Sequence, residues 1–219
     1  MINAGKCPPE PEELKAAKER GFNYVELYLG ESHVNDLRDS IRAVEESEVE
    51  VVSIHTPHSN LEEKEDFEKA GEMAEELDAF LVFHSQYVHH VHIPRLEKLE
   101  IDCDYGYENN PGVSKRLLEA LILENGHELV LDTAHFFMAE ENYLQETEEL
   151  LESYGEHIPV IHLCDSSRQK DGLPFGEGEM DMESMCRVID ESDFDGILVL
   201  EVMPDHQEDA LARWNEYTG

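Results

Sequence analysis

Short apolar runs alternate with charged, helix-like segments along almost the whole chain, and this alternation constrains the fold more than any other feature. Eight runs have the composition of buried strands, and nearly all are followed by a segment that begins and ends like a helix. Such alternation predicts a parallel sheet with helices packed outside it. Eight units favour an α/β fold of the closed (β/α)8 type, the TIM barrel, over an open sheet of five or six strands. The expected strands are 1–5, 22–29, 48–55, 79–84, a run that ends near 108, 128–132, 158–163 and 196–202.

The chain shows no linker and no internal repeat, so residues 1–219 are expected to form one compact domain. A typical barrel of this type has about 250 residues. The shortfall lies between His84 and Glu108, where the crossover has little room for a full helix. The expected helices are 8–21, 34–47, 61–77, 112–125, 143–154, 182–191 and 208–217.

The charge of the chain is extreme: 52 acidic against 16 basic side chains give a formal net charge of -36. The apolar runs argue against disorder, and the acids crowd the helix-like segments, where they would form a solvated face. We interpret this charge as halophilic adaptation to a very salty cytosol, because salt screens the self-repulsion. Nucleic-acid binding needs a basic surface, so the composition disfavours a nucleic-acid partner.

Localisation signals are lacking in the sequence. The N-terminus has no basic and apolar signal-peptide regions, and no apolar run approaches the roughly 20 residues of a membrane span. The cysteines are far apart and are typical of reduced, mostly buried thiols. We therefore expect a soluble cytoplasmic protein without a membrane partner, and we leave a homo-oligomer open. The cysteines are Cys7, Cys103, Cys164 and Cys186.

Ionisable side chains stand where the strand-like runs end. From the second of them onward they are 29, 24, 24, 30 and 39 residues apart, close to one strand–helix unit each. In a barrel the carboxyl ends of all strands face one mouth, so these groups would converge there. A mixture of imidazole and carboxylate suits zinc or a divalent transition metal rather than calcium. The residues are Glu26, His55, His84, Glu108, Asp132, His162 and Glu201.

Each of these residues, taken alone, has an ordinary structural explanation. A histidine at a strand end is more often a hydrogen-bonded core residue than a metal ligand. Asp132 in "LDTAH" could simply cap the following helix. The occurrence of all of them at strand ends favours a shared metal site.

The motifs "YVELYL", "SIHTPH", "YENNPG", "LDTAHFF", "IHLCDS", "GEGEMD" and "GILVLE" follow one another in this order over almost the whole chain. Together they resemble the xylose isomerase-like barrel superfamily. That superfamily contains sugar and sugar-phosphate isomerases and epimerases, and also repair nucleases of the endonuclease IV type. The ordered set is typical of the superfamily rather than of one member.

The resemblance implies a central divalent ion, such as Mn, Zn or Co, held by four residues. It also implies that His55 and His84, with Glu108 as a bridge, either hold a second ion as in the nuclease branch or line a sugar site. In an isomerase, Glu108 and Glu201 would be both ligands and the acid/base pair that acts through an enediolate. The four implied ligands are Glu108, Asp132, His162 and Glu201.

The nuclease branch has a third ion, whose first ligand matches His135 and whose other two come from an Asp-x-His before "PFGEG". This chain has Lys170, Asp171 and Gly172 there, so the resemblance implies an incomplete third site. We therefore expect a metal-dependent isomerase or epimerase with a small-molecule sugar or sugar-phosphate substrate. The alternatives are an endonuclease IV-like hydrolase of abasic DNA, a metal-binding barrel without catalysis, or other chemistry on a polyol.

Two further roles are expectations of the resemblance. Glu26 would hydrogen-bond substrate hydroxyls or support its neighbours, and His135 would lie beside the substrate or the ligands. A phosphate-binding group has no clear signature, and the candidates are Lys6, Arg168 and Lys170.

Overall fold

The computed structural model describes residues 1–219 and contains eight parallel strands in the order β1-β10-β7-β6-β5-β4-β3-β2, which forms a closed barrel. This confirms the α/β barrel expected from the alternation of strands and helices. Strand lengths of four to six residues are ordinary for buried strands. The barrel strands are β1 (Ile2–Cys7), β2 (Tyr24–Tyr28), β3 (Glu50–His55), β4 (Phe80–Phe83), β5 (Tyr105–Glu108), β6 (Glu128–Asp132), β7 (Val160–Leu163) and β10 (Ile197–Leu200).

The chain divides into two compact units, residues 4–108 and residues 109–219 with 1–3. The expectation of a single domain over 1–219 stays a prediction. In the 4–108 unit the helices are α1 (Pro11–Glu19), α2 (Glu31–Asn35), α3 (Leu37–Glu45), α4 (Lys64–Glu76) and α5 (Ile93–Leu96), with the 3-10 turn η1 (Ser85–Tyr87).

The short crossover expected before Glu108 is confirmed, because it contains only η1 and the four-residue α5. Its chain packs closely on α4: a Cβ on Gly71 would lie 3.0 Å from the Ile101 side chain. Aromatic rings complete this part of the core, with the Phe67 ring 5.1 Å from that of Tyr87 in an edge-on arrangement. A small residue in the helix thus lets a short segment cover the sheet in place of a full helix.

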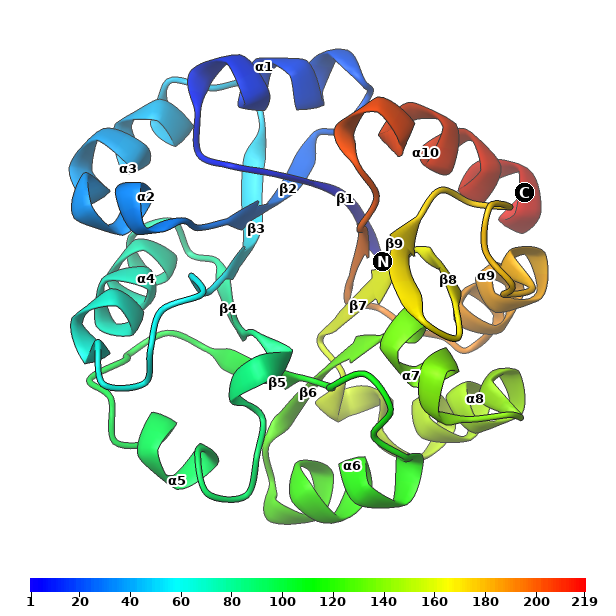
Figure 1. Cartoon of the computed structure of the whole chain (residues 1–219). Coiled ribbons are helices and arrows are strands. Elements are labelled where there is room, and N and C mark those ends of the chain that lie inside the picture. The colour runs from blue at the N-terminus through cyan, green and yellow to red at the C-terminus, as the bar shows by residue number, and fades with distance from the viewer. The chain divides into compact units, whose positions relative to one another are not determined.

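The 109–219 unit contains α6 (Lys115–Leu121), η2 (Leu123–Asn125), α7 (Thr133–Ala139), α8 (Tyr143–Tyr154), η3 (Gly155–His157), α9 (Met182–Glu191) and α10 (Pro204–Thr218). It also contains a hairpin, β8 (Asp165–Ser167) and β9 (Lys170–Leu173), whose strands pair antiparallel. Figure 1 shows this hairpin beside α7. The hairpin was not expected from the sequence, and α7 was expected only as a helix that Asp132 could cap.

Several helix boundaries differ from the expected ones for local reasons. The segment expected as one helix over 34–47 is interrupted at Asp36, whose backbone is not helical. Helix α6 begins only at Lys115, because Gly112 has a left-handed φ of 77° and cannot belong to the helix. Helix α10 begins earlier than expected, at Pro204, whose ring fits the first helical position. Helices α8 and α9 have the expected bounds.

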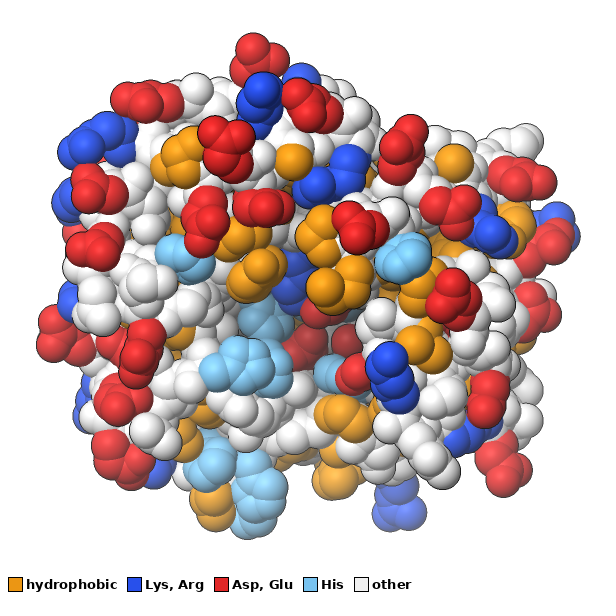
Figure 2. Space-filling view, turned by 45° about the horizontal axis from the view of Figure 1, so that its top comes forward, with side chains coloured by type: hydrophobic (Ala, Val, Ile, Leu, Met, Phe, Trp, Pro, Cys, Tyr) orange, Lys and Arg blue, Asp and Glu red, His pale blue; other side chains and the backbone are white.

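Most acidic side chains reach the surface, as the charge pattern predicts; the buried exceptions are Glu26, Glu108, Asp132 and Asp165. In the face drawn in Figure 2 the acidic side chains are scattered widely, with only isolated Lys and Arg side chains between them. Cys7, Cys164 and Cys186 are buried, which confirms the expectation for most of the thiols. Helices long and apolar enough to cross a bilayer were not found.

Candidate metal and catalytic site

The structure places five of the seven residues expected at strand ends at, or directly after, the carboxyl end of a barrel strand. His55, Glu108 and Asp132 are the last residues of their strands. His84 and Glu201 follow directly after β4 and β10. Parallel strands point these ends toward one side of a sheet, which is why a sequence pattern at strand ends becomes a cluster of side chains. The two remaining residues are Glu26 within β2 and His162 within β7.

In the 109–219 unit, Asp132, His162 and Glu201 form a compact group. One ligand atom from each lies within 4.8 Å of the others. Nδ1 of His162 is 2.9 Å from Oε2 of Glu201, and the His162 side chain is fully buried while that of Glu201 is 27% exposed. Two carboxylates and one imidazole held this close are a donor set that fits a divalent ion such as zinc or manganese.

Asp132 is both a helix cap and a candidate ligand. Its Oδ1 accepts the backbone N–H of His135 at 2.8 Å, so it caps α7 as the sequence suggested. The buried Asn109 accepts the N–H of Asp132 through its side-chain oxygen at 2.7 Å and donates to the Asp132 carbonyl at 3.0 Å. These bonds hold the carboxylate rigidly, and because a carboxylate has about four acceptor positions, a capping bond does not prevent it from binding a metal. Asp132 can therefore cap α7 and bind a metal ion at the same time, so the two roles suggested by the sequence are compatible.

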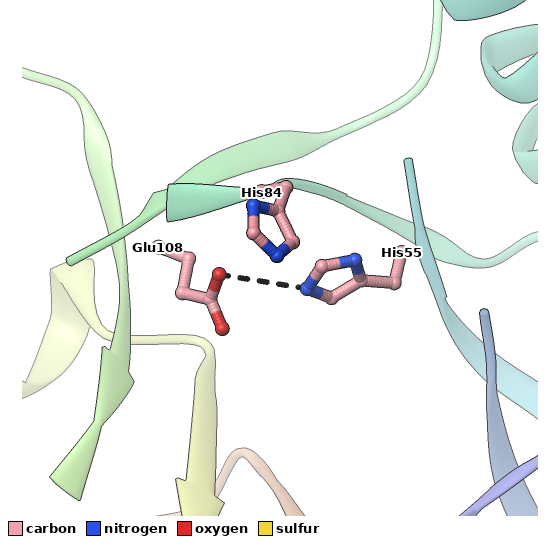
Figure 3. Close-up of side chains that lie close together, drawn as sticks. All are labelled: His55, His84 and Glu108. Carbon is pink, nitrogen blue, oxygen red and sulfur yellow. Dashed lines mark ion pairs between the residues drawn. The ribbon is translucent and has the colours of Figure 1, made fainter. Parts of the chain in front are cut away.

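In the 4–108 unit, His55, His84 and Glu108 form a second group whose ligand atoms lie within 4.8 Å of one another. Figure 3 shows the three side chains pointing toward a common point. Nε2 of His55 is 3.5 Å from Oε2 of Glu108, and the same oxygen accepts the N–H of Ser85 at 2.8 Å. His55 and Glu108 are buried.

The two histidines of this group differ in how well they are prepared to bind a metal. Nδ1 of His55 faces the carbonyl of Thr56 at 3.4 Å, which leaves Nε2 as the nitrogen that faces Glu108. Nδ1 of His84 instead accepts the N–H of Gln86 at 3.1 Å. That bond favours the tautomer with the proton on Nε2, so binding through Nε2 of His84 would require the proton to move. His55 is therefore the better prepared ligand.

His58 is a neighbour that the sequence reasoning did not single out. Its ring centroid lies 4.1 Å from that of His84. Burial lowers the pKa of His58, and burial lowers the pKa of His84 further, to about 3. Both imidazoles are thus neutral near pH 7, the form that binds metal ions. The motif "SIHTPH" contained the signal, since it places a histidine three residues after His55.

His84 should make the metal-free protein sensitive to acid. Its folded pKa of about 3 lies below the ordinary value of 6.5, so the unfolded chain binds a proton first as the pH falls. The stabilisation is complete above about pH 6.5 and is lost progressively below it, by roughly 3 kcal/mol at most at pH 4. We expect the free energy of unfolding of the chelated wild type to fall more between pH 7 and pH 4 than that of His84→Asn. Urea titrations in high salt measure this, and parallel pH profiles would contradict it.

Glu26 contacts two other polar side chains of the barrel interior. It is fully buried, and its Oε1 lies 3.0 Å from Nζ of Lys6, whose side chain is 11% exposed. Its Oε2 accepts the hydroxyl of Ser53 at 2.8 Å. The three residues are register partners on β1, β2 and β3, which explains their contact.

His135 is buried on α7 and is held through both ring nitrogens. Nδ1 lies 2.8 Å from the carbonyl oxygen of Asn109, and Nε2 lies 2.9 Å from Oδ2 of Asp171 on β9. The hydrogen bond with His135 lowers the pKa of Asp171. His135 belongs to neither group of candidate metal ligands. Asp171, which stands one position away from the Asp of the nuclease pattern, is thus brought to His135 by the β8–β9 hairpin.

Asp165 is a further buried residue that the sequence reasoning missed. Its carboxylate accepts four backbone N–H groups, those of Ser166, Gly176, Gly178 and Met180, at 2.7 to 3.2 Å. A Cβ on Gly178 would lie 2.2 Å from Oδ1 of Asp165, so only glycine fits there. The "GEGEMD" turn is therefore a fixed loop wrapped around one carboxylate.

Comparison with known proteins agrees with this geometry at the level of the family and the fold. Residues 98–216, more than half of the chain, match the family described as xylose isomerase-like TIM barrel. No curated protein sequence matches the chain.

Solved structures resemble the whole chain at low sequence identity. A D-tagatose 3-epimerase-like protein has a TM-score of 0.75 and 19% identity, over 100% of this chain and 98% of that one. The IOLI protein with a bound zinc atom has a TM-score of 0.68 and 14% identity, over 100% and 96%. An AP endonuclease of family 2 from Brucella melitensis also has 0.68 and 14%, over 99% and 98%. Identities this low support the fold and leave the reaction to be argued from the residues.

Proposed function

Because this chain belongs to the xylose isomerase-like TIM barrel family, we propose that it is a divalent-metal-dependent isomerase or epimerase of sugars. The single observation that carries the proposal is the compact set of two carboxylates and one imidazole, with only Glu201 partly exposed, at the ends of β6, β7 and β10. A zinc-containing relative and an epimerase-like relative of the same fold support it.

We propose Glu108 as the fourth ligand of that ion, beside Asp132, His162 and Glu201. Strand β5, which ends at Glu108, neighbours β6 in the strand order, and β6 ends at Asp132. The four residues provide three carboxylates and one imidazole, which suits Mn, Zn or Co. When bound, such an ion would polarise two neighbouring oxygens of a hydroxy-ketone and stabilise the enediolate charge that develops on them.

The proton transfers are assigned to Glu108 and Glu201. A carboxylate on one side of the substrate takes the proton from carbon, and a carboxylate on the other side returns a proton. Glu201 suits this role because its side chain is partly exposed and follows the end of its strand. Asp132 suits the role of ligand alone, because its carboxylate is fixed by the cap of α7.

The group of His55 and His84 has two uses in this proposal. It can hold a second ion together with Glu108, or its neutral imidazoles can line the sugar site. The proton on Nε2 of His84, favoured by the bond from Gln86, makes the second use the simpler one. His135 is a supporting residue, held between the carbonyl of Asn109 and the carboxylate of Asp171.

The proposal is tested with the wild-type protein kept in high salt and supplied with Mn, Zn or Co. We expect at least one bound divalent ion per chain by elemental analysis, because the donor set is preassembled. Incubation with mixed ketoses in deuterated water should place solvent deuterium at a carbon position, as measured by mass spectrometry. A protein that binds no ion, or labels no ketose, contradicts the proposal.

A phosphodiesterase acting on abasic DNA is the second candidate, and the group of His55, His84 and Glu108 together with the AP endonuclease relative favours it. Lys170 and Gly172 weigh against it, because an ammonium group is a cation and glycine has no side chain, so neither residue can replace the Asp and His ligands of the nuclease pattern. Figure 2 also shows acidic side chains scattered over the drawn face, where the Lys and Arg side chains form no continuous basic surface. Nicking of abasic DNA without deuterium incorporation would reverse the order of the two candidates.

A further inference from the structure

Lys6 and Glu26 form a buried ion pair in the interior of the barrel. Their charged atoms are 3.0 Å apart, and the side chains are 11% and 0% exposed. Removing two charges from water costs free energy that a pair of apolar side chains would not cost. The pair therefore needs an explanation beyond stability.

The position of the pair connects it with the candidate site of the same unit. Glu26 binds Ser53, and Ser53 lies two residues before His55 on β3, so both project from the same face of that strand. Of the two ions, Lys6 is the one with remaining exposure, so a ligand in the site would meet the ammonium group first.

The other cations expected as phosphate contacts are directed elsewhere. Arg168 donates through one nitrogen to the carbonyls of Phe137 and Glu140, and its guanidinium lies over the Phe137 ring, 4.0 Å from the centroid. Lys170 is exposed at the end of the β8–β9 turn. Of the three candidate cations, Lys6 is therefore the one left to contact a phosphate ester, and its positive charge is already balanced by Glu26. The net charge of -36 of the whole chain adds further repulsion of a phosphate.

We propose, building on the function proposed above, that Lys6 and Glu26 together recognise hydroxyl groups of an uncharged, polyhydroxylated substrate, and that the site rejects phosphorylated sugars. An ammonium group donates and a carboxylate accepts, so the neutral pair complements a hydroxyl, which does both. A phosphate dianion needs a surplus of positive charge, which the pair does not offer. The preference for free sugars over phosphorylated sugars then results from the neutralisation of Lys6 by Glu26, although a lysine is present in the site.

The test compares free ketoses of four to six carbons, D-tagatose among them, with their terminal phosphate esters on the metal-loaded protein. Affinities are measured by calorimetry, which is independent of turnover, and deuterium incorporation is measured in parallel. We expect at least one free ketose to bind at least 10-fold more tightly than its phosphate ester. Tighter binding of the phosphate esters, or no binding of any sugar in the set, would overturn the inference.

The variant Glu26→Gln sharpens the test, because it keeps the shape and leaves the ammonium charge unbalanced. We expect its affinity for the free sugar to fall about 10-fold and its affinity for the phosphate ester to rise about 10-fold. Unchanged affinities for both would overturn the inference. Lys15→Met is the control, since it breaks an exposed ion pair with Glu19 on α1 and should change neither affinity.

Two further results distinguish a failure of the recognition pair from a failure of the proposed isomerase function. The double variant Lys6→Met with Glu26→Gln removes both charges, so it serves if Glu26→Gln fails to fold. It should lose free-sugar affinity without gaining phosphate affinity, and retained free-sugar affinity would overturn the inference. Sugar binding with the expected charge dependence but without deuterium incorporation overturns the isomerase function and supports the recognition pair.

Discussion

Glu108→Gln is expected to lose the bound divalent ion, with an affinity for the metal lower by at least about 100-fold. Changing a residue that merely orients a ligand costs 10 to 100-fold, and Glu108 is proposed as a ligand itself. The buried Glu108 also joins His55 and His84 in the second group, so one substitution weakens both candidate sites. Glutamine keeps the size of the side chain and can still accept the N–H of Ser85, so the fold should survive.

The measurement is elemental analysis of wild type and variant after the same metal loading in high salt, followed by calorimetric titration with Mn, Zn and Co. Glu124→Gln is the matched control, because it makes the same chemical change at an exposed position. We expect the control to bind as much metal as the wild type. Equal metal content in Glu108→Gln and wild type would remove Glu108 from the proposed ligands.

Glu201→Gln should abolish proton transfer more strongly than it weakens metal binding. General acid–base groups contribute roughly 100-fold to 10,000-fold to a rate, and an amide can neither take nor return the proton. Oε2 of the partly exposed Glu201 lies 2.9 Å from Nδ1 of the fully buried His162, a contact that a glutamine amide can keep as a hydrogen bond. At a saturating metal concentration we expect deuterium incorporation into a responsive ketose to fall by about 1,000-fold or more.

This result is measured by mass spectrometry of the sugar, with metal content determined on the same samples. Glu208→Gln on α10 provides the control at an exposed position. A variant that retains its metal but has lost exchange identifies Glu201 as a proton-transfer residue. Normal exchange in Glu201→Gln would assign the chemistry to other side chains.

Much of the fold could be predicted because strands and helices leave local patterns. Val34, Leu37, Ile41 and Val44 lie on one face of a helical pattern, and all four are buried. The ends of α8 and α9 agree with the expected bounds, since polar and turn residues surround them. The interruption at Asp36 and the late start of α6 depend on backbone angles that the hydrophobic pattern does not encode.

The candidate site also has a part that could be predicted from the sequence and a part that could not. The pattern of residues is enough to predict that acids and imidazoles stand at the ends of successive strands and meet, because all strands of a parallel barrel end at one mouth. The contacts between residues distant in the sequence became known from the folded structure. It paired Asp171 with His135, closed a loop around Asp165, and balanced Lys6 with Glu26. Those contacts depend on strand register and hairpin geometry, and on distances of a few ångströms that decide whether two charges neutralise each other.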